Sequence, residues 1–199
     1  EILSMDYTSV LSQMSKEGFS APVRRFTFAL PNAKEELQQA LSCVANSMGE
    51  QLQWLPEYDE VAAWLSDNKG KGLFLFGSCG RGKSLLTRYA LPMIFRAKLN
   101  RSVKVVDCAY NGVNIDEVVK YPFLALDDLG AEEDVVNYGT KRQLVSEVIC
   151  RAQDNPKMFV IASSNYDGEA LRERYGERVL DRIKYLFYQV SFNGKSLRK

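Results

Sequence analysis

Short apolar runs alternate with longer amphipathic stretches over the last two thirds of the chain. Five runs of four to six β-type residues predict strands, at positions 72–76, 103–106, 122–126, 158–162 and 187–192. Three stretches with helical spacing lie between them, at positions 83–99, 139–154 and 167–185. Nearly continuous apolar runs are typical of strands that are buried on both faces of a sheet. We therefore predict an α/β fold in which a parallel five-stranded sheet lies between layers of helices.

The first seventy residues follow a different pattern. Residues 1–31 mix Ser, Thr, Pro and aromatic side chains without sustained periodicity, which predicts a partly ordered arm. A helix is predicted to begin after Asn32, because five apolar residues recur at helical spacing, namely Leu37, Leu41, Val44, Met48 and Leu52. A second short helix is expected over residues 58–65. This pattern predicts an N-terminal arm and helix at residues 1–53 and the main domain at residues 54–199.

Composition fits one folded domain with an extension, since 46% of the 199 residues are hydrophobic and 26% are charged. The formal net charge is only +1, so any nucleic-acid site must be local. Charge is nevertheless divided along the chain. Residues 68–106 contain nine Lys and Arg and no acid, while residues 107–134 contain eight Asp and Glu and one Lys. A phosphate site followed by a metal site would explain the two blocks, and a DNA-binding role for the basic block is the alternative.

The absence of histidine excludes several kinds of chemistry. Ser-His-Asp and Cys-His nucleophile systems and His-containing zinc sites all need a side chain that this sequence lacks. The four cysteines lie 29 or more residues apart without a C-x-x-C pair, which argues against a zinc ribbon or a disulfide framework. No apolar run reaches the roughly 18 residues of a membrane helix. We therefore expect a cytoplasmic protein with no membrane partner.

Residues 77–84 match the pattern G-x-x-x-x-G-K-[ST] directly after a predicted strand and before a predicted helix. Glycines in such a loop let the backbone wrap a phosphate with its N–H groups at the positive end of the helix. Lys83 is expected to contact the β- and γ-phosphates of ATP, and the Ser84 hydroxyl is expected to bind Mg²⁺. A glycine-rich turn without a ligand is the alternative. The predicted nucleotide-binding residues are Gly77, Ser78, Cys79, Gly80, Arg81, Gly82, Lys83, Ser84 and Leu85.

Two more predicted strands end in polar residues that suit the same chemistry. Asp127 and Asp128 follow the apolar run 123–126. Asp127 suits the second shell of the Mg²⁺ site, and Asp128 suits the polarisation of an attacking water, a task for a carboxylate where histidine is lacking. A solvated acid pair in a turn is the alternative. Asn165 follows the strand at 158–162 and could orient the water or contact the γ-phosphate, although Ser-Asn is also common in turns.

Two arginines on a late helix form a further candidate. Arg178 and Arg182 are four residues apart, on one face of a helix whose other face carries Val179, Leu180 and Ile183. In ring ATPases, an arginine in such a place enters the nucleotide site of the next subunit and stabilises transition-state charge. The alternative is a surface helix in which Arg178 pairs with a neighbouring acid.

These motifs, in this order, resemble the DnaC/DnaI/IstB branch of the AAA+ ATPases. The resemblance covers residues from about 54 to 199 and rests on four stretches: GKGLFLFGSCGRGKS, LDDLGAEE, SSN and GERVLDRI. It implies that residues 77–84 are the Walker A motif, Asp127 and Asp128 the Walker B motif, Asn165 sensor 1, and Arg182 the arginine finger with Arg178 beside it. It also implies an AAA+ P-loop core, ATP and Mg²⁺ as cofactors, and assembly on DNA.

The sequence departs from the pattern of that branch in three places. The segment at 109–120 is shorter than the DNA-contacting insertion that loaders usually have there. The chain ends soon after its fifth strand, which predicts no C-terminal lid domain. Residues 1–50 are too short and irregular for a complete helicase-docking domain.

The leading hypothesis is an ATP-hydrolysing helicase loader. Its expected partners are a replicative helicase, further copies of itself across the arginine-finger interface, and single-stranded DNA. The alternatives are an IstB-like transposition helper that binds DNA, a small-molecule P-loop kinase and an inactive nucleotide-binding adaptor.

Overall fold

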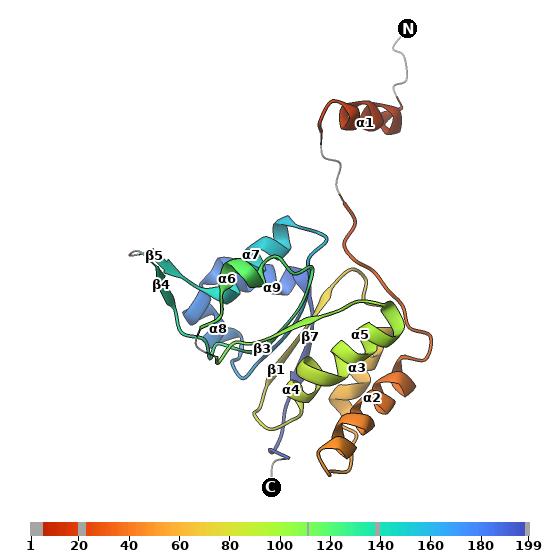
Figure 1. Cartoon of the computed structure of the whole chain (residues 1–199), viewed down its shortest axis with the longest axis vertical. Coiled ribbons are helices and arrows are strands. Elements are labelled where there is room, and N and C mark those ends of the chain that lie inside the picture. The colour runs from red at the N-terminus through yellow and green to blue at the C-terminus, as the bar shows by residue number, and fades with distance from the viewer. Residues whose placement is uncertain (1–5, 20–22, 111, 138–139, 198–199) are drawn as a thin grey trace.

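A five-stranded parallel sheet forms the centre of the molecule (Figure 1). The structure is a computed structural model that describes residues 6–19, 23–110, 112–137 and 140–197. The strand order is β2-β3-β6-β1-β7, and every neighbouring pair is parallel. The strands are β1 (Gly72–Gly77), β2 (Lys104–Asp107), β3 (Phe123–Leu129), β6 (Phe159–Ser164) and β7 (Phe187–Phe192). All five predicted strands are present, and the predicted α/β fold class is confirmed.

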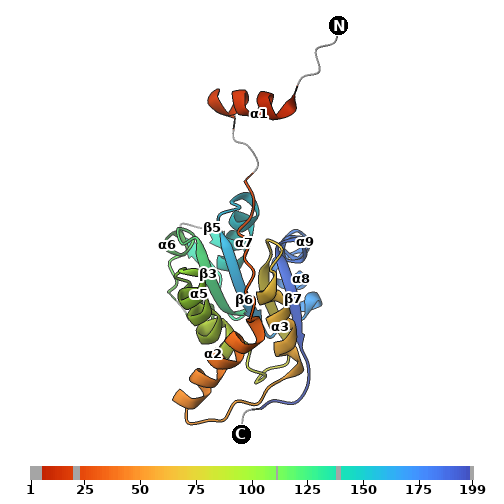
Figure 2. The same ribbon diagram turned by 90° about the vertical axis from the view of Figure 1, so that its right-hand side faces the viewer.

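Helices cover both faces of this sheet (Figure 2). Alternate residues of one strand point to opposite faces, as in β1, where Leu73 and Leu75 join one core and Phe74 joins the other. The first core is shared with α2 (Ala33–Ser47), α3 (Pro56–Ser66), α4 (Lys83–Leu85), the π-helical turn η1 (Leu86–Ala90) and α5 (Leu91–Leu99). The second is shared with α6 (Ile115–Val118), α7 (Leu144–Asp154), α8 (Gly168–Tyr175) and α9 (Glu177–Leu186). Within the described ranges, no helix is both long and apolar enough to cross a membrane.

The N-terminal arm contains a helix that the sequence pattern did not predict. Helix α1 (Tyr7–Lys16) begins after Asp6, whose side chain accepts a hydrogen bond of 3.1 Å from the amide of Thr8. It has no buried residue and lies apart from the sheet in both views (Figures 1 and 2). The segment was expected to be only partly ordered, and the structure adds that its described part contains one short capped helix. Residues 1–5 lie outside the described residues.

The chain just before α2 packs into the domain in an extended conformation. Phe26 and Phe28 join an aromatic cluster with Trp64 and Phe159. The buried side chain of Asn68 holds this segment in place, since it accepts from the amide of Phe28 at 2.9 Å and donates to the carbonyl of Phe26 at 3.1 Å. Residues on the N-terminal side of position 54 thus contribute to the core of the sheet domain.

Three predicted helix boundaries are corrected by the structure. Helix α2 ends at Ser47, not near Leu52, because Gly49 with φ 74° reverses the chain. The stretch predicted as a helix over 139–154 starts with an antiparallel hairpin, β4 (Val135–Asn137) and β5 (Thr140–Arg142), and becomes helical only at Leu144. Gly139 itself lies outside the described residues. The stretch at 167–185 is divided into α8 and α9 by Gly176, whose φ is 83°.

Candidate nucleotide-binding site

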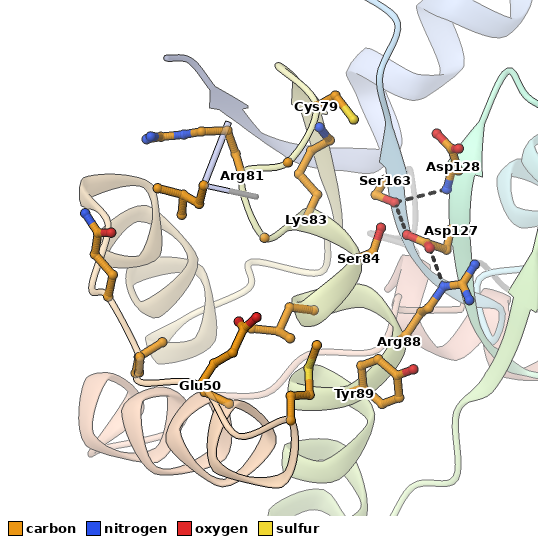
Figure 3. A pocket seen from close by; sticks show the side chains of 18 of the residues that line it. Glu50, Cys79, Arg81, Lys83, Ser84, Arg88, Tyr89, Asp127, Asp128 and Ser163 are labelled. Carbon is orange, nitrogen blue, oxygen red and sulfur yellow. Dashed lines mark hydrogen bonds and ion pairs between the residues drawn. The ribbon is translucent and has the colours of Figure 1, made fainter. Parts of the chain in front are cut away.

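The carboxyl ends of four strands open onto one cavity of about 1000 Å³. Lys83 and Ser84 reach it from the start of α4, and Asp127 and Asp128 reach it from the end of β3 (Figure 3). Asn165, the residue after β6, also lines the cavity. In open parallel sheets, ligands bind at this edge. The structure thus brings together the lysine, the hydroxyl, the acid pair and the amide that were selected from the sequence.

The segment from the end of β1 to the start of α4, which we call the P-loop (residues 77–84), is packed too tightly for side chains at its three glycines. Gly77 has φ 113°, and a Cβ there would lie 2.5 Å from the carbonyl oxygen of Phe192. Gly82 has φ 85°, and a Cβ there would meet the Tyr58 hydroxyl at 2.4 Å. Burial raises the pKa of that tyrosine to about 12. A compact backbone cradle at a helix N-terminus suits the phosphates of a nucleotide.

Lys83 is buried in the cradle. Its ammonium group is linked through Asn165, the residue after β6, to Asp128 of β3. The Nζ of Lys83 donates to the carbonyls of Gly77 and Ser78, both at 2.8 Å, and to Asn165 Oδ1 at 2.9 Å. The Nδ2 of the same asparagine donates to Asp128 Oδ1 at 2.6 Å. Asn165 therefore bridges the P-loop lysine and the second aspartate.

Asp127 is almost fully buried, and two side chains bind its carboxylate. Ser163 Oγ donates to Oδ1 at 2.5 Å, and Arg88 Nε donates to Oδ2 (Figure 3). Arg88 also forms an ion pair with Asp107 at 2.5 Å between Nη2 and Oδ2. The hydrogen bond to Asp127 raises the pKa of the guanidinium further above its ordinary value. Arg88 and Asp107 were not selected from the sequence.

A signal for both residues was present. Arg88 lies four residues after Ser84, which places it one helical turn beyond the P-loop on the same side of the helix. Asp107 ends the run Val105-Val106, just as Asp127 ends its own apolar run. A search for acids at every strand end would have found the second residue, and its register partner in β3 is Asp127.

The backbone of Asp128 adopts a conformation that is rare for a residue with a side chain. Its φ is 62°, and the pairing of β3 with β6 changes register between Leu126 and Leu129. The irregular turn lets Asp128 bond to Asn165 while Asp127 bonds to Ser163. Burial, with the neighbouring Asp127 carboxylate, raises the pKa of Asp128. Strain of this kind is typical of functional sites, where the surrounding structure holds it.

The P-loop is fixed from outside by α3 and by the chain after β7. Arg81 forms an ion pair of 2.6 Å with Glu57, and both side chains are largely buried. The amide of Leu197 donates to the carbonyl of Gly80 at 2.9 Å, and the amide of Asn193 donates to Glu57 Oε1 at 3.3 Å. The side chain of Arg81 is thus held by α3, and the predicted contact of this residue with a nucleotide concerns its backbone.

Another part of the cavity wall was not predicted as a whole, and it mixes apolar side chains with those of Glu50, Gln51 and Gln53. Met48, Leu52, Leu85 and Tyr89 line it, the first two from the segment between α2 and α3. Apolar and aromatic walls beside a phosphate cradle suit a purine base. Of these four residues, only Leu85 was predicted from the sequence to bind a nucleotide.

Comparison with known proteins gives structural neighbours only, since no family model and no curated protein sequence matches. A candidate primosome component from Streptococcus pyogenes serotype M3 is 22% identical over 84% of each chain, with a TM-score of 0.50. DnaI is 28% identical over 64% of this chain and 73% of its own, with a TM-score of 0.47. The DnaC helicase loader is 21% identical over 83% and 93%, with a TM-score of 0.49. This chain has the fold of the AAA+ P-loop proteins.

The predicted magnesium ligands fit that AAA+ fold. Ser84 lies at the start of α4 and lines the cavity together with Asp127. Among the described residues there is no group of three or more His, Cys, Asp and Glu side chains that could hold a metal. Mg²⁺ that is bound with a nucleotide needs only one or two protein ligands, because phosphates and water supply the rest. The donor set of this cavity is therefore suitable for Mg·ATP.

Arg178 and Arg182 do not line the cavity at the P-loop. They line a separate hollow of about 660 Å³, which we call the arginine hollow and which also includes Lys71, Gln153, Asp181, Lys184 and Tyr185. Arg182 Nη1 donates to Cys150 Sγ on α7, and Cys150 is a free thiol like the other three cysteines. Arg178 is exposed, and the acid Glu177 pairs with Arg172 at 2.7 Å. The opposite face of α9 is buried, as predicted.

Proposed function

We propose that this chain is a Mg²⁺-dependent AAA+ ATPase. The observation that carries the proposal is the connected set Lys83, Asn165 and Asp128 beside the buried Asp127, all at the mouth of the P-loop. These groups come from separate strands. ATP hydrolysis requires a phosphate cradle, a buried acid, and a second acid with a bridging amide. A glycine-rich turn without a ligand would not need this arrangement.

Each residue has a task that its position supports. Lys83, which now donates to carbonyls of its own loop, would donate to phosphate oxygens, and the P-loop amides would bind the same group. Ser84 and Asp127 would hold Mg²⁺, which when bound neutralises phosphate charge. Asp128 would polarise the attacking water, with Asn165 fixing its orientation. The raised pKa of Asp128 makes its carboxylate a better proton acceptor than an exposed aspartate.

We further propose that the ATPase acts in the cytoplasm as a loader of a replicative helicase. Two findings support this role: the motif order resembles that of the DnaC/DnaI/IstB branch, and the fold is shared with a candidate primosome component. In this proposal ATP binding drives assembly with the helicase and with further copies of the chain. Hydrolysis then acts as the release step. Single-stranded DNA is a further proposed partner.

Purified protein tests the ATPase proposal directly. Lys83→Ala should reduce phosphate release from Mg·ATP to background, because it removes the charge in the cradle and the bridge to Asn165. Lys98→Ala is the matched control, since Lys98 pairs with Glu36 on the surface at 2.7 Å. Equal turnover in the wild-type and Lys83→Ala proteins would contradict the assignment.

The partner proposal needs a variant that binds ATP without hydrolysing it. Asp128→Asn should serve, because it keeps Lys83, Ser84 and Asp127. Used as bait with ATP, it should retain a hexameric helicase if the chain is a loader. Salt-sensitive, ATP-dependent coating of duplex DNA without helicase capture would instead favour the transposition helper.

A further inference from the structure

Both carboxylate oxygens of Asp127 are bound by side chains of this chain. Ser163 Oγ donates to Oδ1 at 2.5 Å, and Arg88 Nε donates to Oδ2 (Figure 3). Asp127 is 1% exposed, so water cannot readily replace these contacts. A buried carboxylate needs a counter-charge, and the guanidinium of Arg88 supplies it.

The same guanidinium contacts a second carboxylate. Its Nη2 lies 2.5 Å from Asp107 Oδ2, and the side chain of Asp107 is 40% exposed, compared with 2% for Asp127. The two aspartates are register partners in β2 and β3. Because different nitrogens bind the two acids, the guanidinium can leave one of them and keep the other. Arg88 is 32% exposed on the cavity wall, which gives it room to turn.

Under the proposed function, Asp127 is also a ligand in the Mg²⁺ shell, together with Ser84. Two cations would then require the same carboxylate. We propose that Arg88 neutralises Asp127 while the magnesium position is empty, and that binding of Mg·ATP makes the guanidinium release Asp127 while it keeps its ion pair with Asp107. Arg88 is then a positioning residue that lowers the dependence of nucleotide binding on Mg²⁺. This inference rests on the proposed function of the cavity.

The charge balance gives the direction of the effect. Two cations, Lys83 and Arg88, face three carboxylates, Asp107, Asp127 and Asp128, so the formal charge of the cluster is −1. Without Arg88 it becomes −2. The more negative cluster repels ATP that lacks Mg²⁺ and attracts Mg²⁺ itself. Removal of Arg88 should therefore increase the ratio of the affinity for Mg·ATP to the affinity for ATP without Mg²⁺.

The experiment measures the Kd of a non-hydrolysable ATP analogue by titration calorimetry, once with excess Mg²⁺ and once with EDTA. In Arg88→Gln, binding with EDTA should weaken about tenfold, while binding with Mg²⁺ stays unchanged or becomes tighter. Arg88→Lys keeps the charge and should retain most of the wild-type ratio. Arg96→Gln is the matched control, because Arg96 is an exposed arginine of α5 with a long hydrogen bond of 3.4 Å to Ser102 Oγ.

Several results would overturn the inference. Equal weakening of binding with Mg²⁺ and with EDTA in Arg88→Gln would make Arg88 a purely structural residue. An unchanged ratio of the Kd with EDTA to the Kd with Mg²⁺ would also contradict the release of Asp127 by Arg88. If Arg88→Gln does not fold, Arg88→Lys serves as the test. A Kd ratio in Arg88→Lys as high as that expected for Arg88→Gln would exclude a role of the positive charge. Failure of the wild-type protein to bind the analogue in either buffer would overturn the proposed function, and with it this inference.

Discussion

The cavity at the P-loop and the arginine hollow both contain basic side chains, but they are built differently. In the cavity, Lys83 and Arg88 are bonded to acids and amides from three strands. The hollow is lined by Arg178, Lys71 and Lys184 together with a single acid, Asp181. Arg182 also lines it and donates to a thiol, Cys150 Sγ. Most of the proposed catalytic groups therefore lie in the cavity of one chain. The hollow holds cations whose proposed anion comes from a neighbouring chain.

The largest expected effect distinguishes an acid of the cavity from an acid of the hollow. Asp128→Asn should lower ATP turnover by about 10²- to 10⁴-fold, because an amide cannot accept the proton of the attacking water. The Kd of ATP should change little, since Lys83 and Ser84 remain. Turnover and equilibrium binding, measured on the same preparation, separate the two effects.

Asp181→Asn is the matched control for this substitution. It makes the same chemical change in the hollow, on the exposed side of α9. We expect turnover close to that of the wild-type protein. Similar losses in both variants would mean that the cavity is not the centre of hydrolysis, and the contrast between the two regions would fail.

The next effect tests whether the hollow acts on another copy of the chain. Arg182→Ala should lower turnover by about 100-fold at concentrations where the protein self-associates, because transition-state charge loses a cation. Nucleotide binding should be retained. Arg182→Ala subunits mixed with Asp128→Asn subunits should regain activity, since each supplies the half-site that the other lacks.

Arg178→Ala provides the comparison within the hollow. Arg178 lies one turn before Arg182 and is more exposed, so a smaller loss is expected. Mixed subunits that stay inactive at every ratio would argue against a shared site. The hollow would then be a basic surface without a role in hydrolysis.

The sequence was sufficient to predict those parts of the site that depend on local pattern. The P-loop, the acids after β3 and Asn165 after β6 each follow a strand in a short motif, and parallel strands bring their carboxyl ends to one edge. The ion pairs of Arg88 depend instead on the register between β2 and β3 and on the π-helical turn that contains it. Neither is visible in a local pattern, because strand register is set by contacts between distant segments.

Boundaries of the helices show the same limit. The apolar periodicity of α2 continues to Leu52, but the helix ends at Ser47, and the residues beyond it line the nucleotide cavity. Helix α1 has the opposite property, since it forms from a local cap without burying a side chain. The division at position 54 stays a prediction, and the packing of Phe26 and Phe28 shows that the segment before it shares the core.

The smallest expected effect concerns the support of the P-loop. Glu57→Gln should leave Arg81 without its charged partner in a largely buried place, with exposed fractions of 13% for Arg81 and 9% for Glu57. The free energy of unfolding should fall by about 1–3 kcal/mol, and the Kd of ATP should rise several-fold because the loop is less fixed. Urea denaturation and calorimetry measure the two quantities.

Asp59→Asn, in the same helix, is the matched control. It removes an exposed ion pair with Lys34 and should change the free energy of unfolding and the Kd of ATP by less. If Asp59→Asn lowered the free energy of unfolding more than Glu57→Gln does, α3 would stabilise the fold without holding the P-loop. Hydrolysis would then depend on the cavity side chains alone.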